Sequence, residues 1–538
     1  MLINTYSAAL VGIDAMIVTV EVNATNGYEF TLVGLPDTAV KEGHERIDSA
    51  IQISGIHLPQ RQYTINMSPA DLKKEGAAFD LTLAIGQLAA TEIVQSRLLS
   101  QFLILGELAL DGHLRPVHGV LPIALAAKQN GFRGVILPTD NANEAAVVDG
   151  IEVYGFDCLT DVIAFLNGTT QAEATQVDVN QLLAEDAFRS ELDLAEVRGQ
   201  HEVRRAVEIA AAGGHNIIMI GPPGAGKSMI AKRIPTILPP MTLAEALETT
   251  KIYSVSGKLR KSNNASDLTS NSAAVKQRSD LTSLVVRRPF RSPHHTITDV
   301  TLVGGGNNPQ PGEVSLAHNG VLFLDELAEF KRSALEVLRQ PLEDGHITVA
   351  RNKLSVDYPT HFMLVAAMNP CPCGHYGDLK HPCTCTPAQR HRYMSRISGP
   401  LLDRIDIQCH IDAVEYDDLR HKADGEPSAA VRERVVRARA IQTERFSGTS
   451  VHCNAQMTPA MVRKYCQLTA EAEQQLRMAM DLYGLSARAY DRILKVARTI
   501  ADLETATHPD LPLSNTLTAT HLLQAIQFRQ LDRSDWGE

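Results

Sequence analysis

Long apolar runs are missing from this 538-residue sequence. The longest ones are interrupted by Asp, Glu or Gly, and none reaches the ~18 residues that a membrane-spanning helix needs. The N-terminus, from Met1 to Val20, also lacks the basic region and apolar core of a secretory signal. These absences predict a cytoplasmic protein without a membrane partner.

An excess of basic residues is missing as well. The chain carries 51 Lys and Arg against 62 Asp and Glu, a net charge of −11. Because proteins that coat a polyanion are usually basic, this balance argues against that class but leaves room for a basic pore or groove. Cysteine is also scarce, and eight cysteines in a cytoplasmic chain of this length do not make a disulfide framework. Four of them are scattered and are expected to be reduced thiols: Cys158, Cys409, Cys453 and Cys466.

Strand and helix patterns divide the chain into domains. At roughly 150 residues per domain, the length allows two to four. Residues 1–168 alternate short apolar strands with helical patterns, which is typical of an α/β or α+β domain. The predicted strands are Ala15–Glu21, Tyr28–Val33, Gln62–Met67, Phe102–Glu107 and Gly134–Pro138, and the predicted helices are Thr38–Ser54, Phe79–Ala90 and Leu121–Asn130.

The rest of the chain predicts a linker and two further domains. Residues 169–195 are polar and acidic, which indicates a linker with some helix. A second α/β unit follows over 196–447, and its stretch 258–284, rich in Ser, Asn and Thr, is expected to be a flexible surface insertion. Residues 448–538 show helical periodicity without a strand pattern. We therefore expect a multidomain α/β protein that ends in an all-α domain.

A phosphate-binding loop follows the apolar strand Asn216–Ile220 and precedes a helical pattern from Met229 to Ile234. This order of strand, loop and helix is the context in which the pattern G-x-x-x-x-G-K-[ST] binds nucleotides. Its glycines let backbone N–H groups approach phosphate, its lysine reaches the β- and γ-phosphates, and its hydroxyl ligates Mg²⁺. The predicted ATP-binding residues are Gly221, Pro222, Pro223, Gly224, Ala225, Gly226, Lys227 and Ser228.

Two carboxylates end a second apolar strand, which runs from Gly320 to Leu324. Paired acids at such a place are costly unless they have a function. We expect Asp325 to hold Mg²⁺ and Glu326 to polarise the attacking water, the alternative for Asp325 being a helix cap. Asn369 follows a third strand and could orient that water. The sequence therefore predicts an enzyme that hydrolyses ATP.

Several strings resemble a known family. GPPGAGKS, VLFLDE, LVAAMNP and LLDRID, in this order, resemble AAA+ ATPases of the magnesium-chelatase-like branch. RPFRSPHHT (288–296), PGEVSLAHNGVLFLDELAEF (311–330), LEVLRQPLEDG (335–345) and MNPCPCG (368–374) resemble the ComM/YifB family, and the resemblance covers essentially the whole chain. It implies a ring, expected to be a hexamer, with ATP between neighbouring subunits. It also implies that Arg404 is the arginine finger and Arg488 the sensor arginine of a helical lid, the alternative for each being a surface ion pair.

The N-terminal domain resembles the Lon-type protease domain through Phe102–Leu108, Leu114–Val120 and Gly134–Pro138. That family cleaves peptides with a Ser–Lys dyad, in which the lysine accepts the proton of the serine. Ala78 stands where the serine would be, and Leu121 follows His118-Gly-Val where the lysine would be. We therefore expect a domain for assembly or DNA contact that is not a protease. Ser68, Lys73 and Lys74 lie nearby and are interpreted as strand-end and turn residues.

A cluster of four cysteines directly follows the strand that ends at Asn369. Its members are Cys371, Cys373, Cys383 and Cys385, arranged as two C-x-C pairs. Four thiolates suit a tetrahedral structural Zn²⁺, although C-x2-C is the usual spacing. The sequence leaves open whether His375 or His381 is a ligand and whether the thiols bind no metal.

Two basic features suggest what an ATP-driven motor would move. A hairpin is predicted over 346–357, and by resemblance to hexameric motors its tip points into the pore, where Arg351 and Lys353 would contact phosphates. The stretch from Lys258 to Arg291 holds eight Lys and Arg against two Asp. Its predicted DNA-contacting residues are Arg287, Arg288 and Arg291, whereas an ordinary turn and a solvated face are the alternatives for the two features.

The resemblance implies a hexameric DNA translocase and helicase that drives branch migration when incoming single-stranded DNA recombines during natural transformation. Its expected partners are single-stranded and branched DNA, further copies of the chain, and recombination proteins. A different reading is a chelatase-type or protein-remodelling ATPase that acts on a protein or metallo-tetrapyrrole partner. The predicted hairpin and the basic stretch favour the DNA motor.

Overall fold

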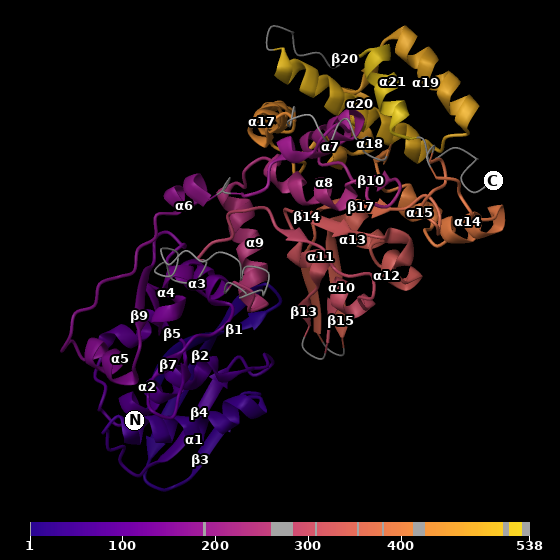
Figure 1. Ribbon diagram of the computed structural model, residues 1–538. Coiled ribbons are helices and arrows are strands. Elements are labelled where there is room, and N and C mark those ends of the chain that lie inside the picture. Colours follow the sequence, from indigo (N-terminus) through magenta and orange to yellow (C-terminus); the bar gives the residue numbers. More distant parts are fainter. Residues whose placement is uncertain are drawn as a thin grey trace. The chain divides into compact units, whose positions relative to one another are not determined.

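The computed structural model describes residues 2–186, 190–259, 283–306, 309–351, 354–378, 381–412, 425–508 and 516–529. The chain forms two compact units, shown in Figure 1. Unit 1 comprises Met1–Glu185 and Thr242–Val286, and unit 2 comprises Asp186–Met241 and Arg287–Glu538. No helix within the described ranges is long and apolar enough to cross a membrane.

Unit 1 contains a four-stranded sheet in the order β1-β2-β4-β3. β1 and β2 form an antiparallel hairpin, β4 pairs antiparallel with β2, and β3 pairs parallel with β4. The helix α2 packs against β1 and β2, and all eleven of its residues are buried, which explains its nearly continuous apolar sequence. The elements are β1 Leu2–Val11, β2 Asp14–Thr25, β3 Phe30–Val33, α1 Thr38–Ile53, β4 Gln62–Ser68 and α2 Asp80–Ala90.

A second sheet of unit 1 has three parallel strands in the order β5-β8-β9. Every strand and helix predicted for residues 1–168 is present within a few residues of its expected bounds. β1 and β9 were not predicted, because Ser7, Ala8 and Ala9 blur the alternation of β1 and Gly155 interrupts β9. The elements are β5 Phe102–Ile104, β6 Glu107–Leu108, β7 Leu114–Arg115, α3 Val120–Gln129, β8 Gly134–Pro138, α4 Thr139–Ala145, β9 Glu152–Phe156, α5 Leu159–Leu166 and, in the linker, α6 Val179–Asp186.

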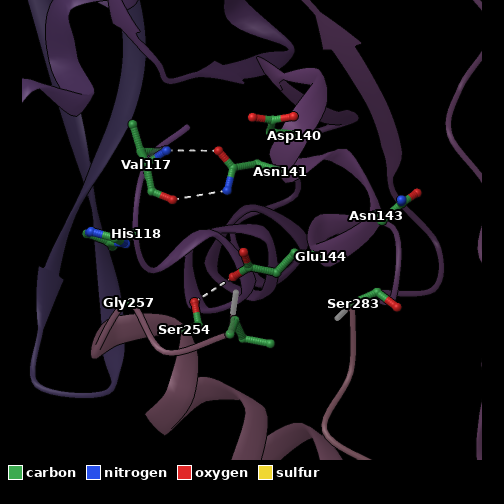
Figure 2. A pocket seen from close by; sticks show the side chains of 10 residues that line it. Val117, His118, Asp140, Asn141, Asn143, Glu144, Ser254, Gly257 and Ser283 are labelled. Carbon is green, nitrogen blue, oxygen red and sulfur yellow. Dashed lines mark hydrogen bonds between the residues drawn. The ribbon is translucent and has the colours of Figure 1, made fainter. Parts of the chain in front are cut away.

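The helix α9 (Leu243–Val255) belongs to unit 1, although residues 196–447 were expected to form one continuous unit. It lies against α3, where the Gly119 N–H donates to the Ser254 carbonyl at 3.2 Å and the Ser254 hydroxyl donates to Glu144 at 2.5 Å. Figure 2 shows the Glu144 carboxylate facing Ser254, and both residues line a small cavity of this unit. Burial raises the pKa of Glu144. The Ser254 hydroxyl and the Leu121 N–H, which donate to its carboxylate, partly offset that rise. Most of the predicted insertion, 260–282, lies outside the described residues.

Ala78 and Leu121, the two positions compared above with a Ser–Lys dyad, have apolar surroundings. Leu121 is fully buried in one hydrophobic cluster of unit 1, and Ala78 packs against the same cluster. Lys74 is also buried, and its ammonium group donates to the Pro69 carbonyl. Burial lowers the pKa of Lys74. Leu121, Ala78 and Lys74 therefore contribute to the packing of unit 1.

Unit 2 is built on a five-stranded parallel sheet in the order β11-β14-β17-β10-β18. Its three central strands are buried at every residue, because apolar clusters cover both faces of the sheet. The strands are β10 Ile217–Ile220, β11 Phe290–Arg291, β14 Val321–Leu324, β17 Met363–Met368 and β18 Ile407–His410, and the helices are α7 His201–Gly213, α8 Lys227–Arg233, α10 Asp299–Val303, α11 Glu313–Leu316, α12 Arg332–Glu336, α13 Arg339–Asp344, α14 Pro387–Met394 and α15 Gly399–Leu402.

The predicted hairpin is confirmed. β15 (His346–Arg351) pairs antiparallel with β16 (Leu354–Pro359), with Val349 opposite Val356. A smaller pair, β12 (Gly304–Gly305) with β13 (Gln310–Pro311), lies beside it.

The C-terminal part of unit 2 is helical, with one correction to the expectation of an all-α domain. β19 (Gln467–Leu468) pairs in parallel with β20 (Thr516–Leu517). Two residues per strand are too short to produce an alternating pattern, so the sequence could not indicate them. The helices are α17 Ser428–Arg445, α18 Pro459–Tyr465, α19 Ala470–Tyr483, α20 Ala487–Thr507 and α21 Ala519–Gln527.

A buried carboxylate joins these helices. Asp502 on α20 accepts from Arg445 on α17 at 2.6 and 2.7 Å and from Arg498 at 2.9 and 3.0 Å. All three side chains are at most 8% exposed. The Asn454 amide also donates to Asp502 at 2.8 Å.

We predict that Asp502→Ala destabilises unit 2 by about 3–5 kcal/mol, because it removes the carboxylate that faces two buried guanidinium groups. Urea unfolding of the variant and the parent measures the difference. Glu433→Ala is the matched control, since Glu433 pairs with Arg437 on the exposed face of α17 and should cost less than about 1 kcal/mol. Equal unfolding of the two variants would contradict the prediction.

Candidate nucleotide-binding site and cysteine cluster

The candidate site lies where β10, β14 and β17 end, because the carboxyl ends of neighbouring parallel strands meet at one edge of a sheet. The phosphate loop follows β10, and its helix α8 begins at Lys227. Gly224 and Gly226 have φ values of +79° and +89°, in the left-handed region that favours glycine. Asp325 and Glu326 follow β14, and Asn369 follows β17. The structure thus brings together residues 142 positions apart, since the Lys227 ammonium group contacts Asn369.

Lys227 is the centre of this edge and is only 9% exposed. Its Nζ donates to the carbonyls of Gly221 at 2.7 Å and Pro222 at 2.8 Å, and to Asn369 Oδ1 at 3.1 Å. Burial lowers the pKa of Lys227, and the nearby Asp325 carboxylate opposes that shift. Oxygens that follow β10 and β17 therefore hold the ammonium group at the loop.

Ser228 and Asp325 form the candidate Mg²⁺ site. The Ser228 hydroxyl donates to Asp325 Oδ2 at 2.6 Å, so an alcohol oxygen and a carboxylate oxygen already lie side by side. The other carboxylate oxygen accepts from the Glu326 N–H at 2.9 Å, which fixes its orientation. Hard oxygen ligands of this kind fit Mg²⁺, which uses one or two protein oxygens together with phosphates and water.

Glu326 is exposed beside this pair, in a strained backbone conformation with φ +53°. Its carboxylate lies 3.2 Å from His295 Nδ1. His295 comes four residues after β11. Because β11 pairs in parallel with β14, the residues that follow the two strands lie side by side. His295 was not predicted as a site residue, because its contact with Glu326 depends on the pairing of β11 with β14.

The two predicted ring arginines lie elsewhere. Arg404 is 7% exposed; its guanidinium group pairs with Glu343 and donates to the Pro400 carbonyl at 2.7 Å. Arg488 is 62% exposed and lies 4.0 Å from Asp403. Among the described residues, neither arginine bonds to the phosphate loop or to Glu326 of the same chain.

The four clustered cysteines converge. Cys371 Sγ lies 3.3 Å from Cys373 Sγ and 3.7 Å from Cys383 Sγ, and the last two are 3.6 Å apart. All four sulfurs lie within 4.8 Å of one another. Zn–S bonds of about 2.3 Å in a tetrahedron place sulfurs about 3.8 Å apart, close to these spacings. Backbone N–H donors, that of His375 first, lower the pKa of Cys373 to about 5, whereas burial raises the pKa of Cys371 to about 12 and also raises that of Cys385.

The two histidines of the loop face Asp378. His375 Nδ1 and His381 Nδ1 lie 3.1 and 3.2 Å from Asp378 Oδ2. This placement favours the four sulfurs as the ligand set and gives the histidines a separate partner.

The cysteine cluster also touches the phosphate loop. A Cβ added to Gly374 would lie 2.7 Å from Pro223 Cδ, so the Gly374 backbone packs against the Pro223 ring. Gly374 has φ +85° and closes a turn by donating to the Cys371 carbonyl at 3.0 Å. The loop that carries the cysteines therefore contacts the phosphate loop that holds Lys227.

The predicted DNA-contacting residues divide into two groups. Lys353 lies outside the described residues, and Arg351 ends β15 with its side chain not described. Arg287 is exposed. By contrast, Arg288 donates to the carbonyls of Pro239 at 2.6 Å and Asn319 at 2.8 Å, and Arg291 pairs with Glu313 at 2.6 and 2.8 Å. These bonds give Arg288 and Arg291 a place within the fold, which the sequence pattern alone could not show.

Three family descriptions match consecutive parts of the chain. The family described as "Magnesium chelatase, subunit ChlI" matches residues 193–269 and 260–419. "Subunit ChlI of Mg-chelatase" matches 20–141, and "Magnesium chelatase, subunit ChlI C-terminal" matches 425–529.

Individual relatives match over almost the full length. Competence protein ComM of Haemophilus influenzae is 42% identical over 531 residues, 98% of this chain and 97% of that protein. The uncharacterized protein YifB of Escherichia coli is 41% identical over 532 residues, again 98% and 97%. Lon protease 2 of Bacillus subtilis is 24% identical over 140 residues, 26% of this chain and 25% of that protein.

The parallel sheet, the phosphate loop and the carboxylates that follow β14 define a magnesium-chelatase-like AAA+ ATPase. Within that class, the chain belongs to the ComM/YifB family.

We predict that His295 positions Glu326, so His295→Ala lowers kcat for ATP hydrolysis by on the order of 10-fold and leaves KM for ATP unchanged. Steady-state kinetics measure both. His295→Gln, which keeps a hydrogen-bond donor, should retain more of the activity. His452→Ala is the matched control, because it removes an exposed histidine of unit 2, whereas His294 packs against the His295 ring at 4.1 Å between centroids. Parental kcat in His295→Ala would refute the positioning role.

Proposed function

We propose that this protein is a hexameric, ATP-driven DNA translocase and helicase that promotes branch migration when incoming single-stranded DNA recombines during natural transformation. One observation carries the ATPase part: Lys227, Ser228, Asp325 and Asn369 meet at one edge of the sheet. The name of the Haemophilus influenzae relative, a competence protein, supports the biological setting.

Within one subunit, each residue has a distinct task. Lys227 donates to the β- and γ-phosphates, and Ser228 and Asp325 hold Mg²⁺. When bound, Mg²⁺ neutralises phosphate charge. Glu326 accepts a hydrogen bond from the attacking water, His295 holds Glu326 in place, and Asn369 orients that water beside Lys227.

Between subunits, Arg404 acts as the arginine finger and Arg488 as the sensor. The Arg404 guanidinium group is already charged and buried, and Glu343 is its partner within the subunit. The γ-phosphate of a neighbour's ATP replaces Glu343 as that partner. Arg488 is exposed and adjacent, at Asp403, so it can follow the same nucleotide.

DNA is gripped in the ring's pore by the hairpin of β15 and β16, through Arg351 and Lys353. Arg287 is a further contact, whereas we assign Arg288 and Arg291 to the fold itself. Unit 1 lacks a serine at 78 and a lysine at 121, so it serves assembly or DNA contact and not proteolysis. Recombination proteins are its expected partners on branched DNA, and the cytoplasm is its expected location.

Turnover in the presence of DNA tests this proposal. We predict that forked and single-stranded DNA raise kcat for ATP, and that Glu326→Gln binds ATP and assembles rings without turning over. A coupled ATPase assay and light scattering measure these outcomes. Absence of both stimulation and DNA binding at low salt would contradict the motor. That result would favour a chelatase-type or protein-remodelling ATPase acting on a protein or metallo-tetrapyrrole, the alternative to which the chelatase match points.

We further propose that Cys371, Cys373, Cys383 and Cys385 hold one structural Zn²⁺, which the sulfur spacings fit. Purified protein should then contain about one zinc per chain, and Cys373→Ser should lose it and bind ATP more weakly, because Gly374 contacts Pro223. Metal analysis and nucleotide titration measure these effects. Cys158→Ser, in unit 1, should keep zinc and affinity. Equal zinc in the parent and in Cys373→Ser would contradict the assignment.

A further inference from the structure

A surface groove runs along one face of α14 in unit 2. Two adjoining clefts share Arg392 and Arg396 as lining residues. Gln389, Arg392, Tyr393 and Arg396 recur at intervals of three and four residues, so one face of α14 and its extension forms a wall. The cysteine cluster lines one end of this α14 groove, and Arg332 lines the other.

The groove is positively charged although the chain is negatively charged. Arg332 and Arg392 are exposed, and within the described part of the chain Arg392 forms no hydrogen bond or ion pair through its guanidinium group. Arg396 is half exposed and is already paired with Glu329 at 2.8 Å. Positive charges gathered along a groove, in a chain of net charge −11, favour a polyanion as the ligand.

An exposed aromatic ring lies beside α14, against Arg390, which is not one of the residues that line the two clefts. Tyr376 belongs to the cysteine-cluster loop and is 42% exposed. The Arg390 guanidinium group lies over its ring, 4.2 Å from the centroid, and orders it. An ordered, accessible ring is a stacking platform for a base, and bases are available for stacking only where a strand is unpaired.

We propose that the α14 groove binds the backbone of a single DNA strand, with Arg392 and Arg332 on phosphates and Tyr376 stacked on a base. The assignment rests on the proposed function as a DNA motor and adds a contact site outside the hairpin of β15 and β16. A duplex would leave Tyr376 without a partner. A neighbouring subunit's nucleotide is the alternative ligand for the arginines, and the ATPase rate without DNA distinguishes it from a DNA strand.

Salt-dependent binding of fluorescently labelled oligo(dT) tests the groove. For single strands, the slope of log K against log salt is about −0.7 per phosphate contact, so Arg392→Ala should reduce its magnitude by about 0.7. Tyr376→Ala should weaken binding about fivefold or more, and Tyr376→Phe should restore it, because phenylalanine also stacks. Arg392→Ala and Tyr376→Ala should keep their zinc content and their ATPase rate without DNA.

The matched control is Arg477→Ala, which removes an exposed arginine from α19 in the same unit. It should leave affinity and slope unchanged. If the parent, Arg392→Ala and Tyr376→Ala all bind oligo(dT) with the same affinity, the groove assignment is wrong, whereas the proposed DNA motor is not contradicted. If the parent binds no DNA at low salt, both proposals fail. A loss of basal ATPase in Arg392→Ala with unchanged DNA affinity would overturn the groove in favour of a neighbour's nucleotide.

Discussion

The burial of one ammonium group constrains the whole of unit 2. Lys227 is 9% exposed, and a charged group at that depth is stable only if oxygens surround it. Those oxygens come from the phosphate loop after β10 and from Asn369 after β17, with the Asp325 carboxylate nearby. The parallel sheet must therefore bring its strand ends together at this edge, and the apolar clusters on its two faces hold them there.

Residues at this edge of the sheet also contact other parts of unit 2. Pro223 touches Gly374, so the cysteine cluster bears on the phosphate loop. His295 reaches Glu326 because β11 is the neighbour of β14. Beyond the sheet, Asp406 is fully buried between His215 and Arg492 of α20, and the adjacent Arg492 charge lowers its pKa despite burial. The C-terminal helix α20 is thus bonded to the residue that precedes β18, in the same sheet that carries the candidate nucleotide site.

Local patterns predicted the elements whose signal is local. The loop from Gly221 to Ser228, the carboxylates after β14 and Asn369 were all identified from strand, turn and helix order. The strand β1, the role of His295 and the contact of Gly374 with Pro223 were not, because each depends on a partner distant in sequence. The basic run in the sequence predicted DNA contacts for Arg288 and Arg291. Their guanidinium groups instead bond to residues of the fold that are distant in sequence.

We propose that ATP hydrolysis at Lys227 drives movement of DNA. The decisive measurement is strand displacement from a forked duplex, followed by fluorescence in the presence of ATP or a non-hydrolysable analogue. We expect displacement with ATP, none with the analogue, and none with Lys227→Ala at concentrations where DNA is still bound. Displacement that proceeds equally with the analogue or with Lys227→Ala would contradict it.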